Sequence, residues 1–171
     1  PLTFLYNKKE NKLELFFPTP IGNNSTFYIK IDATCRPTDN ILEGLYFDVA
    51  PEGAPPQIIS QCQQWGFQRI MPFIDDCRAK CTWRTTIEAS SAYTHLISNG
   101  DVCKETNPRG VPEPLENNTS RKRITYVNNI PMPPYLFVAA VGTWEEVSDF
   151  VILPNGRKVK LEYLVPPGKA N

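Results

Sequence analysis

The chain has 171 residues, 41% of them hydrophobic and 21% charged, a length that suits one domain able to bury about 70% of its unfolded surface. Its 18 Lys and Arg residues balance its 18 Asp and Glu residues, so bulk charge argues against nucleic acid or an anionic membrane as a partner. The longest apolar run, residues 135–141, is far shorter than the roughly 18 residues of a membrane-spanning helix. The sequence therefore predicts a single soluble domain over residues 1–171, with no nucleic acid and no membrane as a partner.

Short strands dominate the predicted secondary structure. The 17 prolines fall mostly between apolar segments, which favours many short strands over long helices. In the first part of the chain, clusters of Gly, Pro and Asn separate predicted strands at residues 12–17, 26–34, 45–49 and 57–61. The predicted fold class is all-β, an antiparallel β-sandwich or a saddle-shaped pair of sheets.

The clearest strand covers residues 81–89. Cys, Trp, Thr, Ile and Ala alternate there with Thr, Arg, Thr and Glu, the period-2 pattern of a half-buried antiparallel strand. Strands are also predicted at residues 96–99 and 121–127, and residues 102–118 between them are predicted to form a long hairpin loop.

The last part of the chain is predicted to hold a central strand and a hairpin. Residues 135–141 (YLFVAAV) form a continuous apolar run, which is typical of a strand covered on both faces. Residues 150–153 and 157–165 flank a Pro-Asn-Gly turn and are predicted to pair as a hairpin. Residues 166–169 (PPGK) are predicted to lead out toward another domain.

Cysteine usage bears on the cellular compartment. The five cysteines are an odd number without regular spacing, which favours reduced thiols over a disulfide framework. The predicted location is the cytoplasm, with a secreted or periplasmic location as the alternative. Cys62, Cys77 and Cys81 could together form a thiolate metal site, but C-x-x-x-C without a second pair favours small buried thiols instead.

Catalytic residues are scarce in this sequence. A zinc peptidase site needs two histidines one helical turn apart and glutamates, whereas His95 is the one histidine of the chain and no HExxH motif occurs. A Ser-His-Asp triad on His95 would lack a G-x-S-x-G turn, so we interpret His95 as structural. The adjacent carboxylates of Asp75 and Asp76 would point to opposite sides of a strand and are more typical of a turn or a helix cap. We therefore predict no catalytic residue and no metal site in the chain.

A pair of glutamines is the best candidate for binding. Gln61 and Gln63 are two residues apart, so on an extended backbone their amides would project to the same side. Their carbonyl groups could accept hydrogen bonds from an ammonium group without burying a charge. The alternative is that both are ordinary solvated glutamines.

Several motifs in the same order resemble the N-terminal domain of the aminopeptidase N family of zinc metallopeptidases. The motifs are LEGLY at residues 42–46, QCQ at 61–63, GFQRI at 66–70, PMPPYLFVAAVG at 131–142 and GRKV at 156–159. The resemblance implies a non-catalytic, saddle-shaped β domain that leans over a separate zinc domain. Zinc and catalysis are then expected in a catalytic domain that follows Asn171 in the same polypeptide.

The resemblance also implies a role for the glutamines. In this family the Q-C-E/Q motif lines the subsite for the first residue of the peptide substrate, so Gln61 and Gln63 are implied to bind the peptide N-terminus. Many members have Glu at the second position, whereas the branch similar to leukotriene hydrolase and aminopeptidase B has Gln. The family's D-x-P turn is replaced here by Asp75, Asp76 and Cys77.

Two other functions are weighed against this one. The first is a catalytically inactive β-sandwich that binds a partner or acts as a scaffold, using Trp65, Trp83 or Trp144. Trp83 is expected in the core, Trp144 at the end of a strand, and Trp65 at the surface. The second is an independent hydrolase using His95 or the Asp75–Asp76 pair, which the sequence supports least. An HExxH motif encoded downstream would favour the aminopeptidase, and a stop codon would favour the binding module.

Overall fold

The computed structural model describes residues 2–39 and 41–170. These residues form two compact units, residues 1–34 and residues 35–171, which are described separately. Strands make up nearly all the regular structure, and their pairing within sheets is antiparallel. The predicted all-β fold class is therefore confirmed. The prediction of one domain over residues 1–171 stays a prediction, and its end residues Pro1 and Asn171 lie outside the described residues.

The first unit contains one hairpin, in which β1 (Thr3–Asn7) pairs with β2 (Lys12–Phe16). The predicted strand at 12–17 is confirmed. The strand predicted at 26–34 is wrong, because that segment has no regular secondary structure. Its apolar residues Phe27, Ile29 and Ile31 remain exposed at 53%, 41% and 37%, and an alternating pattern without a partner strand leaves its backbone groups unpaired.

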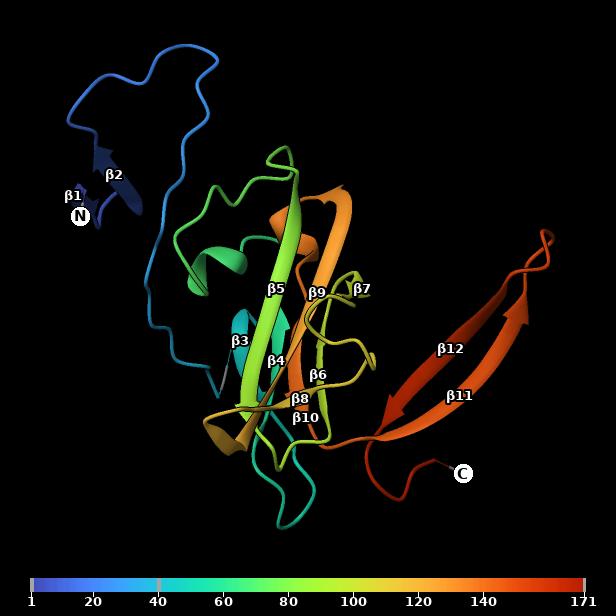
Figure 1. Cartoon of the computed structure of the whole chain (residues 1–171). Helices are drawn as coiled ribbons and strands as arrows, with labels where there is room; N and C mark the ends of the chain where they lie inside the picture. Colours follow the sequence, from blue (N-terminus) through green and yellow to red (C-terminus); the bar gives the residue numbers. More distant parts are fainter. Residues whose placement is uncertain (1, 40, 171) are drawn as a thin grey trace. The chain divides into compact units, whose positions relative to one another are not determined.

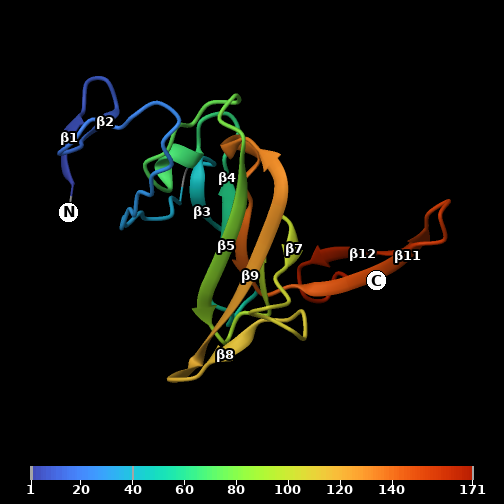
Figure 2. The same cartoon turned by 45° about the horizontal axis from the view of Figure 1, so that its top comes forward.

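The second unit contains two sheets and a hairpin (Figures 1 and 2). The first sheet has the order β3-β4-β10-β6, the second has the order β5-β9-β7 with β8 also paired to β9, and β11 pairs with β12. The bounds are β3 Gly44–Asp48, β4 Gln57–Gln61, β5 Cys81–Ser90, β6 His95–Ser98, β7 Asp101–Val102, β8 Glu113–Leu115, β9 Asn118–Met132, β10 Ala139–Gly142, β11 Glu145–Ile152 and β12 Lys158–Val165. In both views β5 and β9 lie in front of the sheet that contains β3, β4, β10 and β6.

Sequence pattern accounts for most of these strands. In β5, half-buried and exposed residues alternate from Cys81 to Ala89, as predicted. The predicted strands at 45–49, 57–61, 96–99 and 121–127 correspond to β3, β4, β6 and β9. The predicted hairpin is β11–β12, whose turn is closed by hydrogen bonds from the Leu153 and Gly156 amides.

Two predictions need correction. The run 135–141 is not one strand, because the 3-10 helix η2 (Pro134–Leu136) precedes β10. Pro133 and Pro134 fix the backbone φ and Pro134 opens the helix. The central position is confirmed, since β10 lies between β4 and β6. The loop predicted at 102–118 is partly ordered, since β8 lies within it.

The buried side chain of Asn107 fastens that loop to β9. Asn107 is 1% exposed; its amide oxygen accepts the Thr125 N–H at 2.9 Å, and its amide nitrogen donates to the carbonyls of Arg123 and Val111 at 3.1 and 3.2 Å. The Asn107 side chain thus hydrogen-bonds to backbone groups of β9 as a neighbouring strand would. These bonds satisfy its own amide atoms, which are buried and need hydrogen-bond partners.

The core is built around an aromatic cluster. Phe67, in the 3-10 helix η1 (Phe67–Arg69), is 2% exposed, and its ring centroid lies 5.1 Å from Phe73, 5.2 Å from Trp83 and 5.0 Å from Phe137. Edge-to-face pairs at these distances add to the free energy of burial. The cluster joins η1, the loop before β5, β5 itself and the segment after η2. Trp83, predicted to lie in the core, contacts this cluster and is half-buried.

No helix among the described residues is both long enough and apolar enough to cross a membrane.

Candidate substrate-binding site

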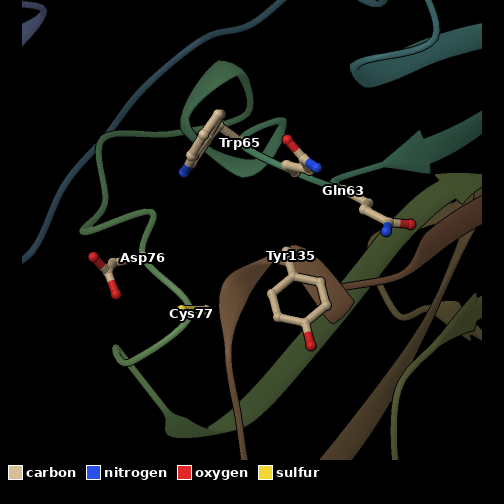
Figure 3. Close-up of a pocket in the computed structure, with 6 residues that line it drawn as sticks. Gln63, Trp65, Asp76, Cys77 and Tyr135 are labelled. Atoms are coloured by element: carbon tan, nitrogen blue, oxygen red, sulfur yellow. The ribbon is translucent and has the colours of Figure 1, made fainter.

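A pocket of about 390 Å³ lies where three separate segments of the second unit meet. Its lining residues come from the turn after β4, from the loop before β5 and from η2, and Figure 3 shows their side chains. They are Gln63, Gln64, Trp65, Asp76, Cys77 and Tyr135. The predicted binding residue Gln63 belongs to this set, whereas Gln61 does not.

The turn after β4 places Gln63 and Trp65 at the pocket. Strand β4 ends at Gln61, Cys62 is 3% exposed, and the Gly66 amide donates to the Cys62 carbonyl at 2.9 Å to close the turn. The peptide bond between Gln63 and Gln64 is cis. Contrary to the expectation, Gln61 and Gln63 do not share one side of a strand, because Gln63 lies beyond the end of β4. Their proposed roles in binding stay a prediction.

The LEGLY and GFQRI motifs contact each other next to the same turn. Glu43 of LEGLY forms an ion pair with Arg69 of GFQRI at 2.7 Å. Gly44 has a φ of +76°, and a Cβ there would lie 2.9 Å from the Arg69 Cβ. Glycine allows both the backbone conformation and the close approach. Gly44 and Phe67 are 23 residues apart in sequence. The two motifs that contain them nevertheless pack against each other in the structure.

The loop before β5 is ordered by its two carboxylates. An oxygen of Asp75 accepts the backbone N–H of Gln68 at 3.0 Å, which ties the loop to η1. Asp76 accepts the backbone N–H of Arg78 at 2.8 Å, an Asx turn. The sequence interpretation of this pair as a turn feature is confirmed.

Asp76 carries the one formal charge among the pocket's lining side chains. Hydrogen bonds from Arg78, at 3.1 Å to each carboxylate oxygen, lower the pKa of Asp76 to about 2, and the charge of Arg78 acts in the same direction. The carboxylate is therefore ionised throughout the neutral range. Because Arg78 is 88% exposed, solvent screens this ion pair.

His95 occupies a structural position on β6. Its Nδ1 atom lies 2.7 Å from the Thr94 hydroxyl oxygen, and its ring centroid lies 6.1 Å from that of Trp144. Thr94 in turn accepts the Trp144 N–H at 2.9 Å. The histidine thus takes part in the junction that precedes β11, and it does not line the pocket.

The pKa of His95 is expected to lie below the usual value of 6.5 in the folded chain, because burial disfavours the charged imidazolium and Lys122 adds to the shift, against the opposing effect of Glu146 and Glu162. Since His95 is the one histidine of the chain, its Hε1 proton gives a single NMR titration curve. Because the folded pKa is the lower one, the associated stability is present above the unfolded pKa and is lost as pH falls through the folded pKa. The same titration in denaturant should return to about 6.5, and a folded pKa at or above that value would contradict the expectation.

The cysteines of the described residues are not grouped as the ligands of a metal ion would be. In the described part of the chain, no three His, Cys, Asp or Glu side chains lie close enough together to hold an ion. Burial raises the pKa of the Cys62 thiol to about 11, with the negative charge of Asp75 as the second cause. A neutral buried thiol is a poor metal ligand, so Cys62 does not suit a zinc ion, and Cys77, unlike Cys62, is exposed.

Four pocket residues were not predicted to bind a ligand together with Gln63: Gln64 and Tyr135, which were not singled out, and Asp76 and Cys77, which were considered for other roles. Trp65 was recognised as an exposed residue, which the structure confirms at 58% exposure. Trp65 is only two residues from Gln63 in sequence, whereas Tyr135 is 72 residues after Gln63. No local pattern indicates that approach, which depends on the packing of Phe67 against Phe137.

Two known proteins are similar to this chain in sequence. Aminopeptidase N of Caulobacter vibrioides is 27% identical over 146 residues, which cover 85% of this chain and 15% of that protein. Leukotriene A-4 hydrolase of Xenopus laevis is 23% identical over 140 residues, 80% of this chain and 21% of that protein. The chain thus spans about a fifth or less of these curated relatives.

A solved aminopeptidase structure is also similar to this chain. The crystal structure of Legionella pneumophila aminopeptidase A in complex with aspartic acid superposes with a TM-score of 0.60 and 26% identity, over 74% of this chain and 13% of that one. A family model described as the peptidase M1 N-terminal domain matches residues 1–136. That match covers most of the chain, including the pocket residues, and the chain therefore belongs to the family of peptidase M1 N-terminal domains.

Proposed function

We propose that the chain is the non-catalytic N-terminal domain of a zinc-dependent aminopeptidase and that it anchors the N-terminus of the peptide substrate. The observation that carries the proposal is the position of Gln63, which lies in a turn directly after β4 and lines an open pocket. The family match and the two aminopeptidases among the similar proteins support this reaction class.

The chemistry of the pocket suits this role. The amide oxygen of an exposed glutamine accepts hydrogen bonds, and a peptide's terminal ammonium group has three to donate. Gln61, the last residue of β4, is half-buried; we propose that it supports the anchor from the neighbouring strand end. Fixing the terminal ammonium would set which peptide bond meets the catalytic groups, a contribution through positioning.

The catalytic chemistry would come from elsewhere in the polypeptide. Because no described cluster of side chains fits zinc, we propose that a following catalytic domain of the same polypeptide holds the ion, which would polarise the scissile carbonyl and activate water. The partners of this chain are then that domain and the peptide N-terminus. The odd number of cysteines supports the cytoplasm as the proposed location.

Replacing Gln63 with alanine in the full-length protein is expected to lower kcat/KM for peptide-like substrates by about 10- to 100-fold, the effect of losing a hydrogen bond to a charged group. Steady-state kinetics on aminoacyl amides measure this. The Gln63→Glu variant is the matched control, because it keeps an acceptor at the same place and should retain activity. Both variants should melt at the wild-type temperature since Gln63 is exposed, and unchanged kinetics for Gln63→Ala would refute the anchor.

The alternative, a catalytically inactive binding module, relies on Trp65, which lines the same pocket. The two functions are separated by hydrolysis: a full-length protein that cleaves no aminoacyl amide would refute the aminopeptidase proposal and favour the binding module.

A further inference from the structure

We propose that the pocket selects peptides whose first side chain is cationic, with Asp76, Trp65 and Tyr135 as the specificity-determining residues. This inference rests on the proposed function and extends it from the terminal ammonium group to the adjoining side chain. Its basis is the composition of the lining: two amides, two aromatic rings, a thiol and a carboxylate, with no basic side chain among them.

The carboxylate provides the first element of selectivity. If Gln63 holds the terminal ammonium group, the negative charge of Asp76 is left to interact with the side chain of the same residue. Arg78 contacts both oxygens of Asp76, but each carboxylate oxygen can accept more than one hydrogen bond. Since Arg78 is almost fully exposed and does not line the pocket, it weakens the field of the carboxylate without filling the site.

The aromatic rings provide the second element. In Figure 3 the Trp65 indole, the Tyr135 ring and the Asp76 carboxylate surround one open space. Indole and phenol faces attract ammonium and guanidinium groups. Trp65 is held by its carbonyl, which accepts the Gln68 side-chain N–H at 3.0 Å, and Tyr135 lies within η2 next to the buried Pro134. The faces are therefore presented by ordered backbone, which limits the entropy lost on binding.

A competing interpretation is that Arg78 makes the pocket prefer acidic side chains. The position of Arg78 argues against it, because Arg78 does not line the pocket and two of its guanidinium N–H groups point to Asp76. The two interpretations predict opposite effects of neutralising either residue. Asp76→Asn should weaken and Arg78→Gln should strengthen recognition of a cation, whereas an acid-selective pocket would respond in the opposite sense.

The kinetic test compares lysine and norleucine amides of a chromogenic amine as substrates of the full-length protein, because norleucine has the same carbon chain without the ammonium group. The ratio of kcat/KM for lysine over norleucine is expected to exceed one. It should fall by about tenfold in Asp76→Asn, the effect of losing one partly screened charge contact, and rise in Arg78→Gln. An unchanged ratio in Asp76→Asn, or a preference for a glutamate amide, would overturn the inference while leaving the proposed function intact.

A second readout does not depend on catalysis. Cys77 is exposed and lines the pocket, so an occupant should protect it from alkylation by iodoacetamide. In the full-length protein, lysinamide should slow alkylation of Cys77 more than norleucinamide does, without protecting Cys35, which does not line the pocket. The comparison is made within each variant, and Asp76→Asn should abolish the difference.

The combined outcomes separate the two proposals. Protection of Cys77 by lysinamide in a protein without hydrolytic activity would refute the aminopeptidase function and retain the cation site. Equal protection by lysinamide and norleucinamide would overturn the cation site whatever the activity.

Discussion

Replacing Phe67 with alanine is expected to lower the free energy of unfolding by about 3–5 kcal/mol, the cost of removing a large buried aromatic side chain. Phe67 is 2% exposed and contacts the rings of Phe73, Trp83 and Phe137. Its loss leaves a cavity shared by η1, β5 and the segments on either side of them. Because Phe73 precedes the Asp76 loop and Phe137 follows Tyr135, the pocket should lose its shape together with the core.

Denaturant unfolding followed by tryptophan fluorescence measures this loss. Phe150→Ala is the matched control: Phe150 is 49% exposed, with Lys158 lying 3.8 Å from its ring centroid, so its replacement should cost less than about 1 kcal/mol. Equal losses for Phe67→Ala and Phe150→Ala would show that the aromatic cluster is not the centre of the core.

Replacing Gly66 with alanine is expected to destabilise the second unit by about 1–3 kcal/mol, because it forces extra volume into a closed turn. A Cβ at this position would lie 2.3 Å from the Gln61 carbonyl oxygen and 2.9 Å from both the Cys62 Cα and the Gly44 nitrogen. All three are backbone atoms and cannot rotate away. The strain would be released by shifting the turn that carries Gln63 and Trp65.

Thermal unfolding and aminoacyl amide kinetics of the full-length protein should therefore both change in Gly66→Ala. Gly22→Ala is the control, because the nearest atom to its added Cβ is the Ser25 hydroxyl oxygen at 3.2 Å, a side-chain atom that can move. That variant should stay within about 0.5 kcal/mol of the wild type. Wild-type stability and kinetics for Gly66→Ala would contradict the packing described for this turn.

The strands that the sequence predicted well are those whose pattern and partner coincide. In β5 the alternation from Cys81 to Ala89 matches the observed burial because β9 lies beside it over almost its full length. The segment 26–34 alternates as well, yet no strand pairs with it. Periodicity describes which faces a strand would have, whereas a strand forms only where backbone hydrogen bonds find a partner.

The binding site was predictable only in part, for a related reason. Gln63 could be identified within a local motif, and Trp65 follows two residues later. Asp76 and Tyr135 join them through tertiary packing: Asp75 binds the Gln68 amide, and Phe137 packs on Phe67. Interactions between distant segments leave no periodic signal in the sequence, so the charge and one aromatic wall of the pocket could be found only in the structure.

The pairing of β4 with β10 has a consequence for how this pocket can change. Ser60, next to Gln61, accepts the Ala139 N–H at 2.8 Å and donates to the Phe137 carbonyl at 3.3 Å, so the strand before Gln63 is fastened to the strand after Tyr135. The hydrogen-bonded sheet therefore fixes the spacing of β4 and β10, about 4.8 Å, and the turn that carries Gln63 and the helix η2 that carries Tyr135 extend from these two strands. New ligand preferences can then arise by exchanging side chains on a fixed frame, which makes the site open to evolution or redesign without loss of the fold.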